Sequence, residues 1–238
     1  MSTLDEFVAR FTDLDLRARQ ARSANEYRAR YLRALRAPTA PERARIARAF
    51  RPHELDALLR ARQLELPPAS AWPALQVLVS DDRRVEGNMP HTMALHPGAP
   101  PAIVMPAGDF AAPDFDAVLS HEYVHLLQRA FPTRFADWYR RHWQLVPAEP
   151  AAPLAARCRA NPDAPPAFAR LPDGRGGPGA SYATVYSELP SRLTDVATIE
   201  VTSGGRQTVR SDLDHPHEQL AAAIEAETIT LMRRGPIR

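Results

Sequence analysis

The stretch Ser120–Arg129 reads SHEYVHLLQR and places two histidines four residues apart, with a glutamate directly after the first. The chain has 8 histidines in 238 positions. At such a composition the pattern His-Glu-x-x-His would arise by chance roughly 0.01–0.02 times per chain. The pattern also lies in the middle of a run, from Asp114 to Phe131, that has the apolar spacing of a helix. Its rarity and its place indicate a function for these histidines, although two packed or surface histidines remain the alternative.

Helix geometry brings the two histidines together. Four residues of helix turn through about 400°, so His121 and His125 lie about 40° apart and one turn along the axis. Two imidazole nitrogens so placed can bind one zinc ion, at about 2.0–2.1 Å. Glu122 is rotated by about 100° from His121, which places it beside the metal. There it could accept a proton from water whose pKa the zinc lowers toward about 7. The opposite face suits a core and carries Phe115, Leu119, Tyr123, Leu126 and Ala130.

In these residues the chain resembles the zincin metallopeptidases, whose active-site helix carries His-Glu-x-x-His. The resemblance implies an α+β fold with a small mixed β-sheet packed on the active-site helix, a Zn²⁺ cofactor, and cleavage of a peptide or protein substrate with Glu122 as general base. The chain departs from the metzincin pattern, which has glycine at position 128 and histidine at position 131, because it has Gln128 and Phe131 there. A third ligand is then expected elsewhere, as in the gluzincins, where a downstream helix supplies a glutamate.

Four acidic residues are candidates for that third ligand. Glu218 is favoured because it lies in the first turn of a helix predicted to begin at Pro216. It opens a Glu-x-x-Ala pattern that resembles the gluzincin ligand helix, where a small residue lets two helices approach. Glu188 precedes a leucine–proline step that favours extended or turn geometry, and Asp195 and Glu200 lie in a predicted hairpin. An acid that complements the helix dipole is the other interpretation of Glu218.

Further side chains are candidates for supporting roles. His215 and His217 flank the start of the same helix and could stabilise an oxyanion or orient a ligand, or be exposed turn residues. In zincins an edge strand before the active-site helix binds extended substrate. That strand could be 88–94, whose His91 would face the cleft, or 101–108. Both NMPHT, around His91, and HPHEQLA, around Glu218, also resemble segments of small zincin-like proteins of bacteria and large viruses. Two tyrosines are alternative oxyanion donors, with core packing as their other role: Tyr182 and Tyr186.

The chain divides into a predicted N-terminal helical region at 1–66 and a metallohydrolase domain at 67–238. In the first, helices are expected through 4–35, around 46–50 and around 55–59. In the second, strands and helices alternate with turns: strands are expected at 74–80, 88–95, 101–106 and 182–189 and as a hairpin at 193–211, and helices at 114–131, 135–143 and from 216 onward. A loop rich in proline, alanine and glycine at 147–180 is a candidate lid.

Composition excludes several classes of protein. Hydrophobic residues make up 45% and charged residues 24%, which are values of a globular chain. The net charge of +2 is too small to imply a nucleic-acid partner. Cys158 is the one cysteine, which excludes an intramolecular disulfide and a cysteine-based zinc site. Neither a signal-peptide run nor an apolar stretch of membrane-spanning length is present. We therefore expect a cytoplasmic protein without a membrane partner, although export without an N-terminal signal stays open.

Two other functions fit parts of the sequence. A zincin-like scaffold could hold zinc structurally, or could bind a partner peptide without cutting it. Glu122 argues against this, because a structural site has no use for a carboxylate beside the metal. The arginine-rich first sixty residues could instead bind nucleic acid, but acidic residues interleaved there favour solvated helix faces.

Overall fold

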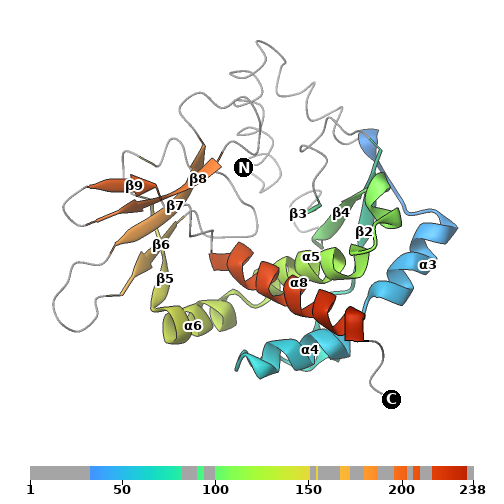
Figure 1. The fold of residues 1–238 in the computed structure, drawn as a ribbon, viewed down its shortest axis with the longest axis horizontal. Helices are drawn as coiled ribbons and strands as arrows, with labels where there is room; N and C mark the ends of the chain where they lie inside the picture. Colours follow the sequence, from blue (N-terminus) through green and yellow to red (C-terminus); the bar gives the residue numbers. More distant parts are fainter. Residues whose placement is uncertain are drawn as a thin grey trace, which may run out of the picture.

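Helix α5 (Phe115–Ala130) carries the His-Glu-x-x-His pattern, as predicted, and lies at the centre of the fold. The structure, a computed structural model, describes residues 33–81, 90–93, 100–150, 154, 167–171, 180–186, 196–202, 206–209 and 216–234. Helices and two β-sheets make up this part of the chain, in agreement with the predicted α+β class. Figure 1 shows the sheets well apart, with α5 and the last helix, α8 (Pro216–Arg234), side by side below them.

A small mixed sheet precedes α5. Its strand order is β1 (Leu35–Arg36), β2 (Val77–Ser80), β4 (Ala102–Pro106) and β3 (His91–Met93), with β2 and β4 parallel and the other pairs antiparallel. All five residues of β4 are buried, as expected of a central strand. Strand β3 is therefore the edge strand, and the alternative prediction of 101–108 as the edge is wrong because β2 and β3 cover β4 on both sides.

The helix predicted through Leu35 ends earlier than expected. Leu35 and Arg36 pair with β2 as an antiparallel strand, opposite Ser80 and Val79. The Arg36 guanidinium also forms ion pairs with Glu42 at 2.7 Å and with Asp81 at 2.7 Å. Helical spacing continues to this point in the sequence, but a long-range strand pairing overrides it. Residues 1–32 of the predicted helix lie outside the described part.

A second, antiparallel sheet follows α5. Its strands run in chain order: β5 (Leu145–Ala148), β6 (Ala167–Arg170), β7 (Ser181–Tyr186), β8 (Val196–Val201) and β9 (Gln207–Val209). The predicted hairpin of β8 and β9 is confirmed by their pairing. The predicted loop at 147–180 is wrong at 147–148 and 167–170, where β5 and β6 pair. Proline- and alanine-rich flanks hide these strands in the sequence, and burial of Phe168 in the pairing stabilises β6.

Three further helices and two short 3-10 turns of the described part surround α5. α3 (Ala40–Ala49) and α4 (Pro52–Ala61) lie in the chain between strands β1 and β2, and α6 (Pro132–Trp143) follows α5 directly, all as predicted. Short 3-10 turns occur at Ala69–Ala71 and Ala107–Ala111. The residues from Glu122 to Gln128 are buried without interruption, so this part of α5 is covered on every side. None of the helices in the described part is long and apolar enough to cross a membrane.

One hydrophobic core joins the helices to the mixed sheet. It includes Leu55 and Leu59 of α4, Ile103 of β4, and apolar residues of α5, α6 and α8. The described part of the predicted N-terminal region therefore contributes to the same core as the helix with the two histidines. α4 is also fastened to α8, because the Arg62 guanidinium forms an ion pair with Glu227.

Alanines of α8 allow it to lie close to α5. Ala221 is fully buried in the core that also contains Leu220 and Ile224, whereas the next residue, Ala222, is exposed. A small buried side chain at such a contact permits close helix approach, and a larger one there would force the helices apart.

We expect Ala221→Leu to lower the free energy of unfolding by about 1–3 kcal/mol, because the added carbons have no space in the packed interface. Ala222→Leu is the matched control, since an exposed helix position should change stability by less than about 0.5 kcal/mol. Urea unfolding followed by circular dichroism measures both. Equal stability of the two variants would contradict the close packing of α5 on α8.

Candidate metal centre

Three side chains from α5 and α8 converge on one point. The Nε2 atoms of His121 and His125 lie 3.2 Å apart, and Oε2 of Glu218 lies 3.4 Å from the first and 3.3 Å from the second. Within the described ranges, no other group of histidine, cysteine, aspartate and glutamate side chains is arranged to hold a metal ion. The structure thus brings together the three residues that the sequence predicted as ligands.

The spacing of these atoms fits zinc. In a tetrahedral site with bonds of about 2.0–2.1 Å, ligand atoms lie about 3.3–3.4 Å from one another. The three separations of 3.2, 3.3 and 3.4 Å agree with one face of such a tetrahedron. Three protein ligands on one face leave the fourth position open, which is the arrangement of catalytic zinc sites.

A carboxylate on α8 orients the first histidine. His121 Nδ1 lies 2.9 Å from Oε2 of Glu225, which follows Glu218 by two helical turns. A proton on Nδ1 satisfies this contact and leaves the lone pair on Nε2, the atom that faces His125 and Glu218. Metal-bound histidines are commonly held by such a second carboxylate, which fixes the ring and raises its basicity.

A buried glutamine orients the second histidine. His125 Nδ1 lies 2.7 Å from Oε1 of Gln128, and Nε2 of Gln128 donates to the Tyr139 hydroxyl at 3.0 Å and to the His217 carbonyl at 3.1 Å. Because a carbonyl only accepts, the amide nitrogen of Gln128 must face His217 and its oxygen must face His125. His125 then carries its proton on Nδ1, and its Nε2 is free to bind metal.

The sequence analysis missed both of these supporting residues. Glu225 follows Glu218 by seven positions, a spacing that returns to the same helix face and could have indicated a pair. Gln128 was noted only because the metzincin pattern has a different residue there. Its spacing of three from His125 is compatible with a contact, but nothing local reveals its partners on α6 and α8.

Charge in the site favours a cation. Burial lowers the pKa of His121, but the hydrogen bonds that its ring donates to Glu218 and Glu225 outweigh burial and raise that pKa to about 10. Burial likewise lowers the pKa of His125, and the charge of Glu218 outweighs it and raises the pKa to about 9. The pKa of Glu218 is held well below its usual range because the two histidines outweigh its burial. The acidic side chains around the two rings therefore favour positive charge at this point, and a divalent cation bound there would supply it.

Glu122 lies beside the ligand group and is not part of it. The residue is only 6% exposed, on the helix turn that carries His121 and His125. Its negative charge helps to raise the pKa of both histidines, so it lies within electrostatic reach of both rings. Its part as a general base stays a prediction.

The other two predicted site histidines have different surroundings. The His217 ring is buried, with its centroid 5.3 Å from the Tyr139 ring and 5.9 Å from the Phe168 ring. Through its backbone carbonyl it supports Gln128, as described above. His91 is in the edge strand β3, which packs against α5. A part for the His217 imidazole in stabilising an oxyanion, and a position of His91 facing the cleft, stay predictions.

Of the three remaining third-ligand candidates, one lies in the described part of the chain. Glu200 is in β8, where its Oε1 accepts a hydrogen bond from the Tyr182 hydroxyl at 3.3 Å, and it does not belong to the ligand group. Glu188 and Asp195 lie outside the described residues, as does His215. Of the four acids considered from the sequence, Glu218 is the one that the structure places beside both histidines.

Comparison of the chain with protein-family models, with curated proteins and with solved structures gave no match. The likeness to gluzincins is therefore one of motif and of ligand arrangement. Any function for this chain has to be argued from the geometry of its own site.

We expect the purified protein to hold about one zinc ion per chain, and His125→Ala and Glu218→Ala to lose most of it, because two remaining ligands make a poor site. Metal analysis after exhaustive dialysis measures the content. Glu200→Ala is the control and should keep its zinc. Retention by Glu218→Ala together with loss by Glu188→Ala would assign the third ligand to Glu188.

Gln128→Leu should weaken zinc binding by about 10–100-fold, the usual effect of removing an outer hydrogen-bond partner of a metal-bound histidine. The physical reason is that His125 loses the acceptor that keeps its proton on Nδ1. Competition with a chelator of known affinity measures the change, and Gln144→Leu, at an exposed position, is the control. Unchanged affinity in Gln128→Leu would show that the amide does not orient the ring.

Proposed function

We propose that the protein is a zinc-dependent metallohydrolase that cleaves peptide bonds. The observation that carries the proposal is the convergence of three ligand atoms, from His121, His125 and Glu218, beside the buried carboxylate of Glu122. The same arrangement supports a gluzincin-like site, with both histidines on one helix and the glutamate on a later one.

The chain's own residues have separate roles in the proposed hydrolysis. Zinc held by the three ligands would polarise the substrate carbonyl and make water a better nucleophile. Glu122 accepts a proton from the attacking water and afterwards gives it to the leaving amine. Glu225 and Gln128 keep the two imidazole rings in the tautomer that binds metal. Burial around α5 limits the access of bulk water to this group.

A catalytic role is favoured over a structural one by the number of ligands. Structural zinc sites are closed by four protein ligands, whereas catalytic ones keep a position for water or substrate. The group in the described part of the chain has three. The alternative, a zincin-like module that binds zinc or a peptide without cleavage, gives no role to the charge of Glu122 so close to the site.

Glu122→Gln should keep its zinc and its fold but lose at least about 10²-fold in the rate of peptide hydrolysis, because the amide cannot accept the proton. The assay is mass spectrometry of a diverse peptide mixture incubated with the zinc-loaded protein. Glu65→Gln, a change at an exposed position, is the matched control and should retain full activity.

Two outcomes would decide against the proposal in different ways. If Glu122→Gln cleaves as fast as wild type, cleavage proceeds without this base. If wild-type protein with its full zinc content cleaves none of the peptides, the non-catalytic alternative replaces the hydrolase.

A further inference from the structure

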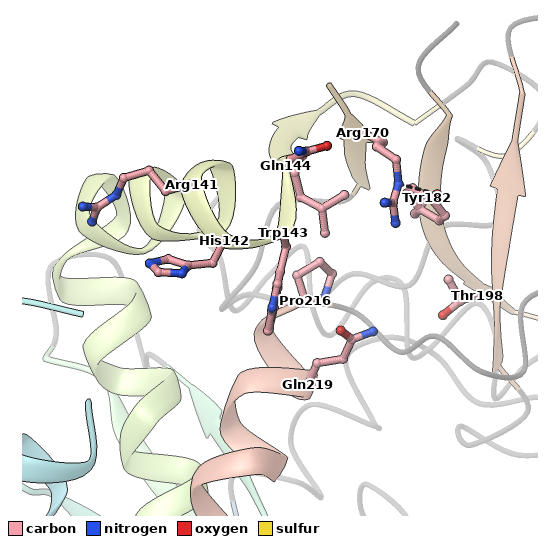
Figure 2. A pocket seen from close by; sticks show the side chains of 10 residues that line it. Arg141, His142, Trp143, Gln144, Arg170, Tyr182, Thr198, Pro216 and Gln219 are labelled. Carbon is pink, nitrogen blue, oxygen red and sulfur yellow. Dashed lines mark hydrogen bonds between the residues drawn. The ribbon is translucent and has the colours of Figure 1, made fainter. Parts of the chain in front are cut away.

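A pocket of about 500 Å³ opens beside the metal ligand Glu218. It lies between the end of α6, the antiparallel sheet and the first turn of α8 (Figure 2). Its size is within the range of pockets that hold small ligands or side chains. The residues that matter for its chemistry are Trp143, Arg170, Tyr182, Thr198, Pro216 and Gln219.

The pocket and the metal centre share one turn of helix. Pro216 and Gln219 line the pocket, while Glu218, between them in the chain, points to the two histidines. A peptide spans about 3.3–3.6 Å per residue when extended. A residue close to a bond held at the metal could therefore place its side chain or its terminus in this pocket.

The charge of the pocket is positive. Its lining includes two arginines, Arg141 and Arg170, and no aspartate or glutamate. In Figure 2 the Arg141 side chain points away on α6, whereas Arg170 lies beside Tyr182. Within the part of the chain that the structure describes, neither arginine forms an ion pair with a carboxylate.

Tyr182 holds the Arg170 guanidinium in place. Nε of Arg170 donates to the Tyr182 hydroxyl at 3.1 Å, and the guanidinium carbon lies 5.6 Å from the centre of the Tyr182 ring. The Tyr182 hydroxyl donates its own hydrogen bond to Glu200, which does not line the pocket. A guanidinium fixed through Nε keeps its two terminal nitrogens for a further acceptor, and their planar geometry suits a carboxylate.

The rest of the lining fits the body of such a ligand. Trp143 and Pro216 provide apolar surface for a short aliphatic stem, and Thr198 and Gln219 are uncharged polar groups. A basic side chain would meet the like charge of Arg170, with no acid in the lining to offset it. An apolar side chain would leave the Arg170 charge without an acceptor on the ligand.

We propose that this pocket is a subsite for a carboxylate of the substrate, held by Arg170, and that the carboxylate is either an acidic side chain or the C-terminus of a peptide. Its part in substrate choice rests on the proposed hydrolase function. Binding of a carboxylate in the pocket does not, because no pocket residue is a metal ligand or the general base.

The test uses Trp143 as a reporter in the zinc-loaded full chain. Trp143 lines the pocket, whereas Trp72 and Trp138 do not, and their indole N–H groups donate to the backbone carbonyls of Pro67 and Arg62. With ¹⁵N-labelled tryptophan, the indole resonances are followed during titration with three compounds: N-acetylglutamate α-amide, N-acetylalanine, and neutral N-acetylglutamine amide. Trp143→Phe assigns the reporter signal.

We expect the Trp143 signal to shift with one or both carboxylates, at an affinity at least about tenfold higher than for the neutral compound, as for a charged hydrogen-bonded group. Which carboxylate binds identifies an acidic side chain or a C-terminus. Arg170→Gln should abolish this difference. Arg134→Gln removes the same charge at an exposed position of α6 and should keep it.

Equal affinity for charged and neutral compounds in the wild type, or a carboxylate preference that survives in Arg170→Gln, would overturn the subsite. Failure of the hydrolase proposal has another signature, namely carboxylate binding without cleavage of any peptide. Cleavage without a carboxylate preference would in turn keep the hydrolase and remove the subsite.

Discussion

The hydrogen bonds of Gln128 join the two helices on which the metal centre depends. Its amide connects the ring of His125, on the same helix, to the backbone carbonyl of His217, which directly precedes Glu218. One side chain thereby contacts a candidate ligand on α5 and the backbone next to another candidate ligand on α8. Both hydrogens of the amide nitrogen are donated, because the Tyr139 hydroxyl is the second acceptor. The buried amide therefore has hydrogen-bond partners for both of its donors.

This arrangement is energetically unfavourable by itself, because it places several charged side chains between two helices. Two histidines and the carboxylates of Glu122, Glu218 and Glu225 lie together between α5 and α8. Buried charges destabilise a fold unless they are paired or bind a metal. A divalent cation bound between the two rings would compensate the charge of these acids. In our proposal, zinc binding would therefore also stabilise the contact between α5 and α8.

The first turn of α8 contributes residues both to the candidate metal centre and to the pocket around Arg170. Glu218 turns toward the metal centre, and its neighbours Pro216 and Gln219 turn toward a pocket with an arginine that Tyr182 holds in place. The antiparallel sheet, which supplies Arg170 and Tyr182, is the part of the fold that the resemblance to zincins did not anticipate. In our proposal it gives this chain its own choice of substrate.

The local sequence was enough to predict that the two histidines lie on one face of a helix with Glu122 beside them, and that a later helix begins at Pro216. Helical spacing and first-turn preferences act over only a few residues, so the sequence alone indicates them. It also favoured Glu218, because this residue lies in the first turn of that helix and opens a Glu-x-x-Ala pattern. Only the tertiary structure decided the partners of these residues: His121 meets Glu225 across 104 positions and Gln128 meets His217 across 89. Strands β1, β5 and β6 and the pocket around Arg170 were likewise decided only by the tertiary structure. They form where distant segments of the chain pair, and no local sequence pattern indicates such pairing.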